Sequence, residues 1–266
     1  MEIINWSRFL LPYTQAVDEL KLKFTNLRRD FIAAGQHSPI QHVEGRVKRV
    51  GAILNKAKQK DIGYDKIAEE IEDIAGIRII CQFVKDIDKV LEMIRIRDGI
   101  DLYIEKEHDY IKDTKPSGYR SFHINISYPM LMADGPISVS AEIQIRTMAM
   151  NFWATIEHSL KYKYSGNLPG GLQARLKNSA EASFFLDQEM GHIREEIVEV
   201  SEAMYLRHDL VDQILKNVEK LHFKIKFDKV NDLNRQFLEI YEECNLERLV
   251  EFNNQLNTIA RLYSVE

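Results

Sequence analysis

Apolar residues recur at every third or fourth position from residue 5 to residue 33, which is the spacing of one face of an α-helix. They are Trp6, Phe9, Leu10, Tyr13, Val17, Leu20, Phe24, Leu27 and Phe31. A glycine and a proline then interrupt the pattern, and the same spacing resumes from near Gln41 through Val43 and Val47. The sequence therefore predicts a long N-terminal helix and a second helix that begins near Gln41.

The period of the apolar residues changes to two after residue 74, which is typical of β-strands. Strands are predicted at residues 77–83, 102–106, 119–128 and 138–147, with a short helix over 87–97. The third of these strands follows a Lys-Pro-Ser-Gly sequence that predicts a tight turn. Its alternate residues are apolar, so we expect one face of this strand to belong to the core.

The rest of the chain reads as helical. Residues 149–166 are predicted to form a helix, and two more are predicted over 230–243 and 246–263. After the first of these helices and before the other two, a narrow apolar stripe indicates a long helix that packs on a partner helix. The stripe consists of Leu172, Leu176, Ala180, Phe184, Leu186, Met190, Ile193, Ile197, Val200 and Met204. This order of elements favours an α+β or mixed α/β core with a long helical C-terminal region.

The composition changes this picture little. The chain has 266 residues, of which 45% are hydrophobic and 29% are charged, as expected for a globular protein. Its two cysteines, Cys81 and Cys244, form no disulfide framework and no zinc spacing, which fits a reducing compartment. No apolar run is long enough to span a bilayer, and no secretory leader is recognisable. We therefore expect a cytoplasmic protein without a membrane partner.

The net charge of −5 implies that any bound anion is held by a local cluster of basic residues. Such a cluster lies within residues 46–60 and comprises Arg46, Lys48, Arg49, Lys56, Lys58 and Lys60. A solvated helix face is one interpretation, and it suits Lys58 and Lys60. Arg46, Lys48 and Lys56 would instead converge on a polyphosphate, because they lie at the entry to a helix and further along it.

Polar residues share one face of the predicted strands. They are Arg78 and Gln82; Tyr119, Ser121, His123 and Asn125; and Glu142, Gln144 and Arg146. A solvated sheet face is one reading. The other is a recognition site, because aromatic, histidine and arginine side chains suit planar and anionic groups. On patterning alone both readings remain open.

Two acids stand beside this polar face in the sequence. Asp73 comes before one predicted strand, and Glu142 lies within another. If they meet, two carboxylates near a basic cluster are a common way to hold Mg²⁺ against nucleotide phosphates. Taken singly, each residue can also be interpreted as an acid on the protein surface without a metal-binding role.

Four segments in this order and spacing closely resemble the synthetase domain of RelA/SpoT-type enzymes, and more narrowly the small alarmone synthetases of the RelQ type. They are GRVK with a lysine ten residues after its arginine, DIAGIR, DYIKDTKPSGYRSFH and EIQIRTMAMNFWATIEHSLKYKYSG. The likeness covers about residues 1–205. It implies a nucleotidyltransferase-like synthetase domain, a mixed β-sheet of about five strands flanked by helices. We assign residues 1–170 to this catalytic domain and 171–266 to a helical C-terminal region that includes an oligomerisation element.

By this resemblance the protein would transfer the β and γ phosphates of ATP to the 3′-OH of GDP or GTP, giving ppGpp or pppGpp and AMP. Arg46 and Arg78 would sandwich the adenine, because a guanidinium stacks on a base and keeps its charge. Lys48 and Lys56 would neutralise the ATP phosphates. The carboxylates of the acid pair would hold Mg²⁺ and serve catalysis.

In the same comparison, Glu142 would also accept the proton of the attacking hydroxyl. Tyr119 would stack on guanine and His123 would contact the acceptor phosphates, with Lys115 and Gln144 as further acceptor contacts. No hydrolase domain with a His-Asp metal centre precedes residue 46, so a synthetase without hydrolase activity is expected.

The resemblance further implies a homotetramer whose central cleft binds pppGpp as an activator. Lys21, Arg28 and Asn151 remain as possible allosteric contacts. The sequence departs from the family pattern at Glu44, which would oppose a bound polyphosphate, and at His108, where an arginine is usual. We therefore expect weak or absent activation, and a several-fold stimulation by added pppGpp would contradict this.

Two alternatives come from other functional classes. One is a catalytically weak module that keeps the fold and binds single-stranded RNA or regulates another protein. The other is an interaction protein defined by its C-terminal helices. The acid pair favours an enzyme, because a module without chemistry has no need of magnesium ligands.

Overall fold

The computed structural model describes residues 5–163, 169–222, 227–243 and 245–262. The chain divides into two compact units, Met1–Gly191 and His192–Glu266. The sequence assignment placed a functional boundary at residue 170, which is where helix α6 (Gly170–His222) begins. That functional assignment stays a prediction, and each compact unit is described by itself below.

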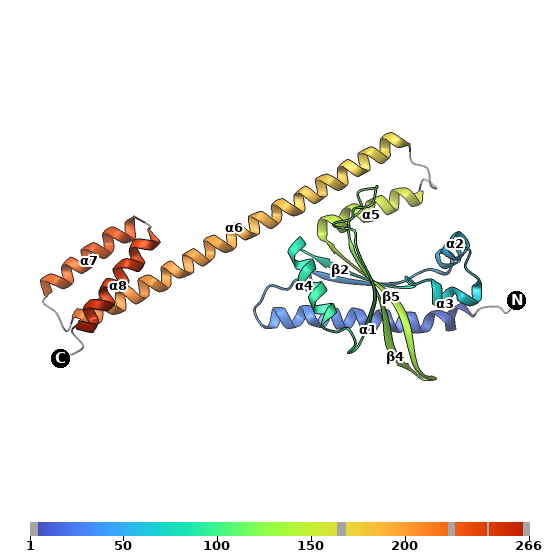
Figure 1. Cartoon of the computed structure of the whole chain (residues 1–266), viewed down its shortest axis with the longest axis horizontal. Coiled ribbons are helices and arrows are strands. Elements are labelled where there is room, and N and C mark those ends of the chain that lie inside the picture. The colour runs from blue at the N-terminus through green and yellow to red at the C-terminus, as the bar shows by residue number, and fades with distance from the viewer. Residues whose placement is uncertain (1–4, 164–168, 223–226, 244, 263–266) are drawn as a thin grey trace. The chain divides into compact units, whose positions relative to one another are not determined.

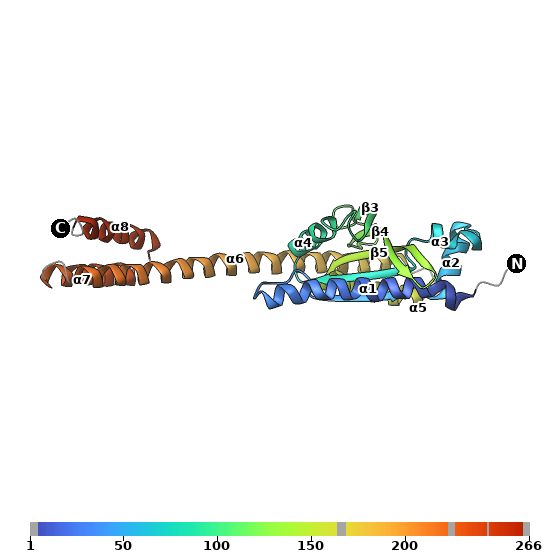
Figure 2. The same cartoon turned by 90° about the horizontal axis from the view of Figure 1, so that it is seen from below.

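The first unit is built on a five-stranded sheet with the order β1-β2-β5-β4-β3. Its strands are β1 His42–Val47, β2 Ala75–Cys81, β3 Tyr103–Asp109, β4 Phe122–Met132 and β5 Gly135–Thr147. Figure 1 labels its strands β2, β4 and β5, and Figure 2 labels β3, β4 and β5. The central strands β2 and β5 run parallel, and the other three neighbouring pairs are antiparallel. The predicted mixed sheet of an α+β fold is confirmed.

Helices cover the apolar face of this sheet. Helix α1 (Trp6–Ala33) packs along β1, β2 and β5, and α4 (Val84–Arg95) packs on β2 and β5 (Figure 1). Alternate strand residues such as Ile77, Ile124 and Ile143 are fully buried in the shared core. Gly45 allows the close approach of α1, because a Cβ there would lie 2.6 Å from Val17 Cγ1. The opposite face of the sheet is consequently left for other chemistry.

The predicted helix beginning near Gln41 is wrong. Residues 42–47 form β1, and the helix α2 begins only at Val50 and ends at Lys60. Val43 and Val47 fit a helical spacing, but the chain here gains more by pairing with β2 in antiparallel register. A β-strand also places Gly45 against α1, so tertiary packing overrides the local pattern.

The strand predicted over 119–128 begins later than predicted, because β4 starts at Phe122 and leaves Tyr119 and Ser121 in the segment before it. The helix predicted over 149–166 is found as α5 (Met148–Lys163), and its predicted end at 164–166 lies outside the described residues. The strand predicted over 138–147 is β5 with a longer start. A short 3-10 helix η1 (Tyr64–Lys66) and α3 (Ile67–Glu70) lead into β2. Cys81 is a buried free thiol in β2, whereas Cys244 lies outside the described residues.

The second unit contains the last part of α6 together with α7 (Phe227–Glu242) and α8 (Leu246–Leu262), and both predicted C-terminal helices are confirmed. Its core is formed by Ile214, Val218, Leu221, Val230, Phe237, Ile240, Leu249, Phe252 and Leu256. Amide groups cross the contact between α6 and α8: Asn217 Nδ2 donates to Asn253 and Asn257. Among the helices that the structure describes, none has the length and apolar character needed to cross a membrane.

Candidate active site

The strand register brings most of the predicted polar residues into two adjoining rows on one face of the sheet, whereas Gln82 follows the end of β2 and lines a different cavity. In the first row Glu142 of β5 lies opposite Gly76 of β2 and Asn125 of β4. In the second row Gln144 lies opposite Arg78 and His123. The face is not merely solvated, because the exposed fractions are 8% for His123 and Asn125 and 4% for Arg146. The interpretation as a recognition surface is the one that this burial favours.

Glu142 is held as a carboxylate at the centre of this face. Gln144 Nε2 donates to its Oε2 over 2.5 Å, and His123 Nδ1 lies 2.9 Å from its Oε1. Burial alone would raise the pKa of Glu142, but these contacts outweigh it and lower the pKa. Since an ionised carboxylate only accepts hydrogen bonds, His123 Nδ1 is the donor. The Glu142 carboxylate is therefore charged and oriented.

Tyr119 joins the same network from the turn before β4. Its hydroxyl lies 2.8 Å from His123 Nε2 and accepts a 2.5 Å bond from Arg146 Nη2. Arg146 Nη2 also donates to Gln144 Oε1 over 2.6 Å. The sequence placed Arg146 on the polar face without a role, and the structure shows that it fixes the positions of both Tyr119 and Gln144.

Asp73 and the two predicted phosphate-binding lysines converge beside β2. Lys56 Nζ lies 2.8 Å from Asp73 Oδ1, and Lys48 forms an ion pair with Oδ2. Burial would raise the pKa of Asp73, but the two ammonium groups outweigh it and lower the pKa. Burial also lowers the pKa of Lys48, which its ion pair partly offsets. The two lysines therefore share one ionised carboxylate, that of Asp73.

A cavity of about 70 Å³ connects the acid pair with the basic residues. Its lining residues are Glu44, Gly45, Arg46, Asp73, Gly76, Ile77, Arg78, Glu142 and Gln144. Arg78 Nη1 donates to Glu44 Oε2 over 3.2 Å, so the unexpected acid of β1 points into this site. The cavity therefore brings together residues that the sequence assigned to adenine, metal and catalysis.

The donor set of this cavity fits a magnesium ion. Asp73 and Glu142 both line it and both have lowered pKa values, so ionised oxygen donors of the kind that Mg²⁺ prefers are present. Among the described residues, no group of three or more His, Cys, Asp or Glu side chains is arranged to hold a metal. The two carboxylates are too few for a closed protein cage, which suits an ion that keeps water or phosphate ligands.

The turn before β4 carries a second cluster of aromatic and cationic groups. Lys115 Nζ lies 4.1 Å from the ring centroid of Tyr110 and 5.0 Å from that of Tyr119. Tyr110 also packs edge-on against His123 and stacks with His108. The sequence reasoning missed Tyr110, although its position in the DYI segment was a signal that could have found it.

Another missed residue is Glu72, the neighbour of Asp73. It accepts a hydrogen bond from Asn125 and forms an ion pair with Lys106 of β3. The Lys106 contact, helped by the Asn125 bond, outweighs burial, which alone would raise the pKa of Glu72, so that this pKa is lowered. Glu72 therefore links the segment before β2 to the far side of the polar face and fixes the approach of Asp73.

The three candidate allosteric residues lie on helices outside this face. Lys21 is exposed and Arg28 half-buried on α1, and Asn151 is half-buried on α5. Arg28 Nε and Asn151 Oδ1 are shielded from solvent without a hydrogen-bond partner in the described part of the chain. These two atoms are unsatisfied polar groups of the kind that a bound ligand would satisfy.

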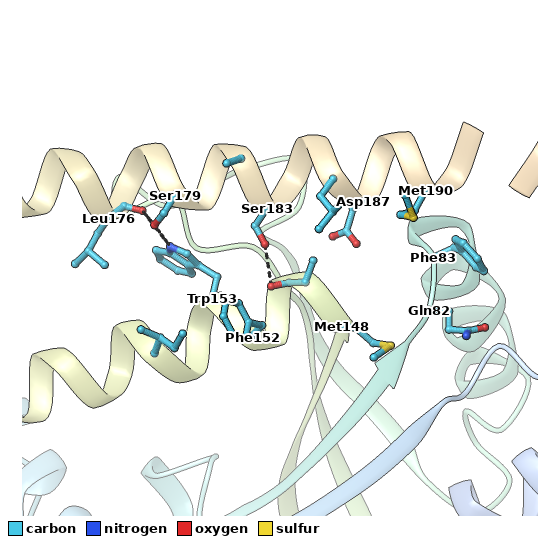
Figure 3. A pocket seen from close by; sticks show the side chains of 14 residues that line it. Gln82, Phe83, Met148, Phe152, Trp153, Leu176, Ser179, Ser183, Asp187 and Met190 are labelled. Atoms are coloured by element: carbon cyan, nitrogen blue, oxygen red, sulfur yellow. Dashed lines mark hydrogen bonds between the residues drawn. The ribbon is translucent and has the colours of Figure 1, made fainter. Parts of the chain in front are cut away.

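The largest cavity that we describe is separate from the polar face. It measures about 840 Å³ and lies between α5 and α6, lined mainly by apolar side chains such as Phe152, Trp153 and Met190 (Figure 3). Trp153 Nε1 donates to Leu176 O, and Ser183 Oγ donates to Ala149 O. These bonds fix α6 on α5, so the cavity belongs to helix packing and not to the acid pair.

Comparison with protein families matches residues 45–167 to the region found in RelA / SpoT proteins. Among curated proteins, GTP pyrophosphokinase YjbM of Bacillus subtilis is 50% identical over 203 residues, which cover 76% of this chain and 95% of that protein. GTP pyrophosphokinase YwaC of the same organism is 40% identical over 195 residues, covering 73% of this chain and 92% of that protein.

Solved structures give the same picture. Small alarmone synthetase 1 from Bacillus subtilis bound to its product pppGpp matches with a TM-score of 0.70 and 51% identity, covering 72% of this chain and 97% of that one. The same enzyme bound to AMPCPP matches with a TM-score of 0.65 and 47% identity, covering 73% and 98%. About a quarter of the present chain therefore lies outside what these relatives contain.

Proposed function

Because this chain belongs to the RelA/SpoT family of GTP pyrophosphokinases, we propose that it transfers the β and γ phosphates of ATP to the 3′-OH of GDP or GTP. The products are AMP and ppGpp or pppGpp, the alarmones of the stringent response. Synthetase activity without hydrolase activity is proposed, in line with small synthetase relatives that this chain covers almost end to end. These relatives give no support to the alternative of a regulatory or RNA-binding module.

One observation carries the proposal. Glu142 is an ionised carboxylate that lines the same cavity as Asp73, Arg46 and Arg78. A charged carboxylate fixed by His123 and Gln144 is suited to accept the proton of the attacking hydroxyl, because its orientation is set before the substrate arrives. The cationic residues beside it are suited to the negative charge of the transferred group.

The ATP side of the site is assigned to β1, β2 and α2. Arg46 and Arg78 line the cavity from neighbouring strands, a placement that supports their proposed stacking on adenine. Lys48 and Lys56 gather on Asp73, where ammonium groups would neutralise ATP phosphates. In this proposal the nucleotide phosphates take over part of the lysine contacts that Asp73 makes.

Magnesium is the proposed cofactor, with Asp73 and Glu142 as the residues that would hold it. When bound, Mg²⁺ would neutralise the charge on the nucleotide phosphates. The chain's own contribution is to keep both carboxylates ionised and close to one cavity. Removal of the divalent ion by a chelator is expected to abolish turnover.

The acceptor side is assigned to the turn before β4 and to the second row of the polar face. Tyr119 offers its ring to guanine, and Lys115 lies over that ring, close to where acceptor phosphates would be neutralised. Gln144 is the remaining residue that we assign to contact with the acceptor nucleotide. Both ring nitrogens of His123 are engaged by Tyr119 and Glu142, so its proposed contact with the acceptor phosphates requires an exchange of the Tyr119 bond.

A homotetramer in the cytoplasm is the proposed assembly and location. Exposed apolar residues at alternating spacings of four and three support self-association: Ile193, Ile197, Val200 and Met204 are 39%, 60%, 59% and 68% exposed. Such spacing is typical of a helix that packs against another helix. Single-stranded RNA remains a possible further partner, and weak activation by pppGpp through Lys21, Arg28 and Asn151 stays a prediction.

The test is to incubate the purified protein with ATP, Mg²⁺ and either GDP or GTP, and to resolve the products by anion-exchange chromatography. AMP that appears in step with a guanosine carrying four or five phosphates would establish the reaction and the preferred acceptor. Absence of both products, with ATP and GDP still bound, would contradict the proposal.

A further inference from the structure

The turn that carries Lys115 and Tyr119 lies directly against helix α6. Gly118 has a φ of +87°, and a Cβ on it would lie 2.6 Å from the Cβ of Ala180. Tyr119 packs on a small cluster formed by Trp153, Ala154 and Ala180. The turn therefore approaches α6 at backbone distance, which only glycine permits at position 118.

Arg120, the residue after Tyr119, crosses from this turn to α6. Its Nη2 donates to Glu181 Oε2 over 2.9 Å, and its Nη1 donates to Gly118 O over 3.3 Å. The guanidinium carbon lies 4.3 Å from the ring centroid of Phe184. Because one side chain contacts both the turn and α6, Arg120 fixes the position of one relative to the other.

Because Arg120 is buried, its guanidinium group depends on the ion pair with Glu181. The residue is only 9% exposed, and its Nε is buried without a hydrogen-bond partner in the described part of the chain. A buried guanidinium is retained at a cost in desolvation, and removal of its partner leaves an uncompensated charge. Glu181 is 38% exposed at its side chain and is the carboxylate that Arg120 contacts on α6.

We propose that the Arg120–Glu181 ion pair positions the acceptor nucleotide by holding Tyr119 and Lys115 on helix α6. Both residues are positioning residues, since the groups that contact the nucleotide are those of the turn. This inference rests on the function proposed above, in which the turn binds GDP or GTP. It makes α6 part of the acceptor site, although α6 contributes no side chain to the polar face of the sheet.

The expected consequence is selective. Without the ion pair, the turn loses its fixed distance from α6, and Tyr119 no longer meets His123 and Arg146 at the distances described above. The KM for the acceptor rises, while the KM for ATP is unchanged because Arg46 and Arg78 lie on β1 and β2. A merely structural role would instead lower the thermal stability and affect both substrates alike.

The experiment compares the wild-type protein with Glu181→Gln, Arg120→Gln and the double variant. Glu189→Gln is the matched control, because it makes the same charge change at an exposed position of the same helix. The rate of AMP formation is measured as a function of GDP concentration at saturating ATP, and as a function of ATP concentration at saturating GDP. Each single variant is expected to raise the KM for GDP about fivefold or more, and the double variant no further, as for two coupled residues.

Binding of GDP, measured by isothermal titration calorimetry, decides the proposal even where a variant turns over slowly. Weaker GDP binding in Glu181→Gln, with the control unchanged, supports the ion pair. Wild-type affinity in both single variants, equal losses for GDP and ATP, or additive effects would overturn it. If the wild-type protein binds GDP but forms no product, the proposed function fails, while the binding comparison still decides the role of the ion pair.

Discussion

At the residue scale, the candidate site depends on the charge of its two carboxylates and on the hydrogen bonds between its polar side chains. Glu142 and Asp73 stay ionised because cationic and amide donors outweigh the effect of burial. His123 Nδ1 donates to Glu142, and its Nε2 lies 2.8 Å from the Tyr119 hydroxyl. Five side chains from two segments of the chain share one set of hydrogen bonds: Tyr119, His123, Glu142, Gln144 and Arg146.

Replacement of Glu142 by glutamine tests its role as the proton acceptor. The amide keeps the shape of the side chain but cannot take up a proton, so turnover is expected to fall about a hundredfold or more. The measurement is AMP formation, with thermal unfolding as a check on the fold. Glu92→Gln on the exposed surface of α4 is the control, and normal turnover in Glu142→Gln would remove this residue from the mechanism.

Glu44 provides a second prediction at this scale. It pairs with Arg78 in the cavity assigned to ATP, and its charge opposes nucleotide phosphates. Glu44→Gln should free the guanidinium and lower the KM for ATP about two- to fivefold, a modest effect because both groups are partly exposed. Steady-state kinetics at saturating GDP would measure this, and an unchanged or higher KM for ATP would contradict it.

At the element scale, patterning predicted most of the fold but not the first strand. The long amphipathic helix α1 and the alternation in β4 and β5 are strong local signals, and both were found. Residues 42–47 carry too few apolar positions to distinguish a strand from a helix, and only the pairing with β2 decides between them. The sequence singled out Asp73 and Glu142, which do line one cavity, although their role stays a prediction. The contacts of Arg120, Arg146 and Glu72 depend on register and helix packing.

The contact between α6 and the end of β5 gives a prediction about pH. Asp187 is 5% exposed and accepts a bond from Thr147 Oγ1, which in turn accepts from Met150 N at the start of α5. Burial raises the pKa of Asp187 from 3.8 to about 6. Between these values the folded chain holds a proton that the unfolded chain has lost, so the free energy of unfolding decreases as the pH rises and levels off above about 6.

Asp187→Asn should remove this dependence, because an amide does not ionise yet still accepts the Thr147 bond. At pH 7 the variant is expected to be more stable by about 1–3 kcal/mol. Urea unfolding of the wild type and the variant at several pH values between about 4 and 8 measures the difference. Parallel pH curves for the two proteins would show that Asp187 is not the group responsible.

At the scale of the whole molecule, the candidate site and the last two helices belong to different compact units. All the site residues lie within Met1–Gly191, and the second unit has its own core in α6, α7 and α8. The relatives named above are matched over 92–98% of their own length by about three quarters of this chain. About a quarter of this chain therefore has no counterpart in those relatives.

A chain that ends at residue 205 tests this division. It lacks the core of the second unit but keeps every residue of the polar face and the contacts of α6 with α5. The kcat and both KM values are expected to stay within about twofold of those of the full chain, because independent units contribute separately. Kinetics of both proteins, with light scattering as a check on assembly, would measure this, and a large loss of kcat at unchanged assembly would contradict it.

The parallel pairing of β2 with β5 also determines when the site can form during synthesis. Arg78 and Gln144 are neighbours in the sheet, yet the residues of α4, β3 and β4 separate them in sequence. When only β1 and β2 have left the ribosome, the unpaired edge of β2 and its isoleucines are exposed. Such an edge can pair with strands of other chains. Pairings of this range form slowly. If Glu142 of β5 acts as proposed, no nascent chain can consume nucleotide before β5 has left the ribosome. By the role proposed for Glu181, the turn before β4 must wait longer still, until this part of α6 has emerged.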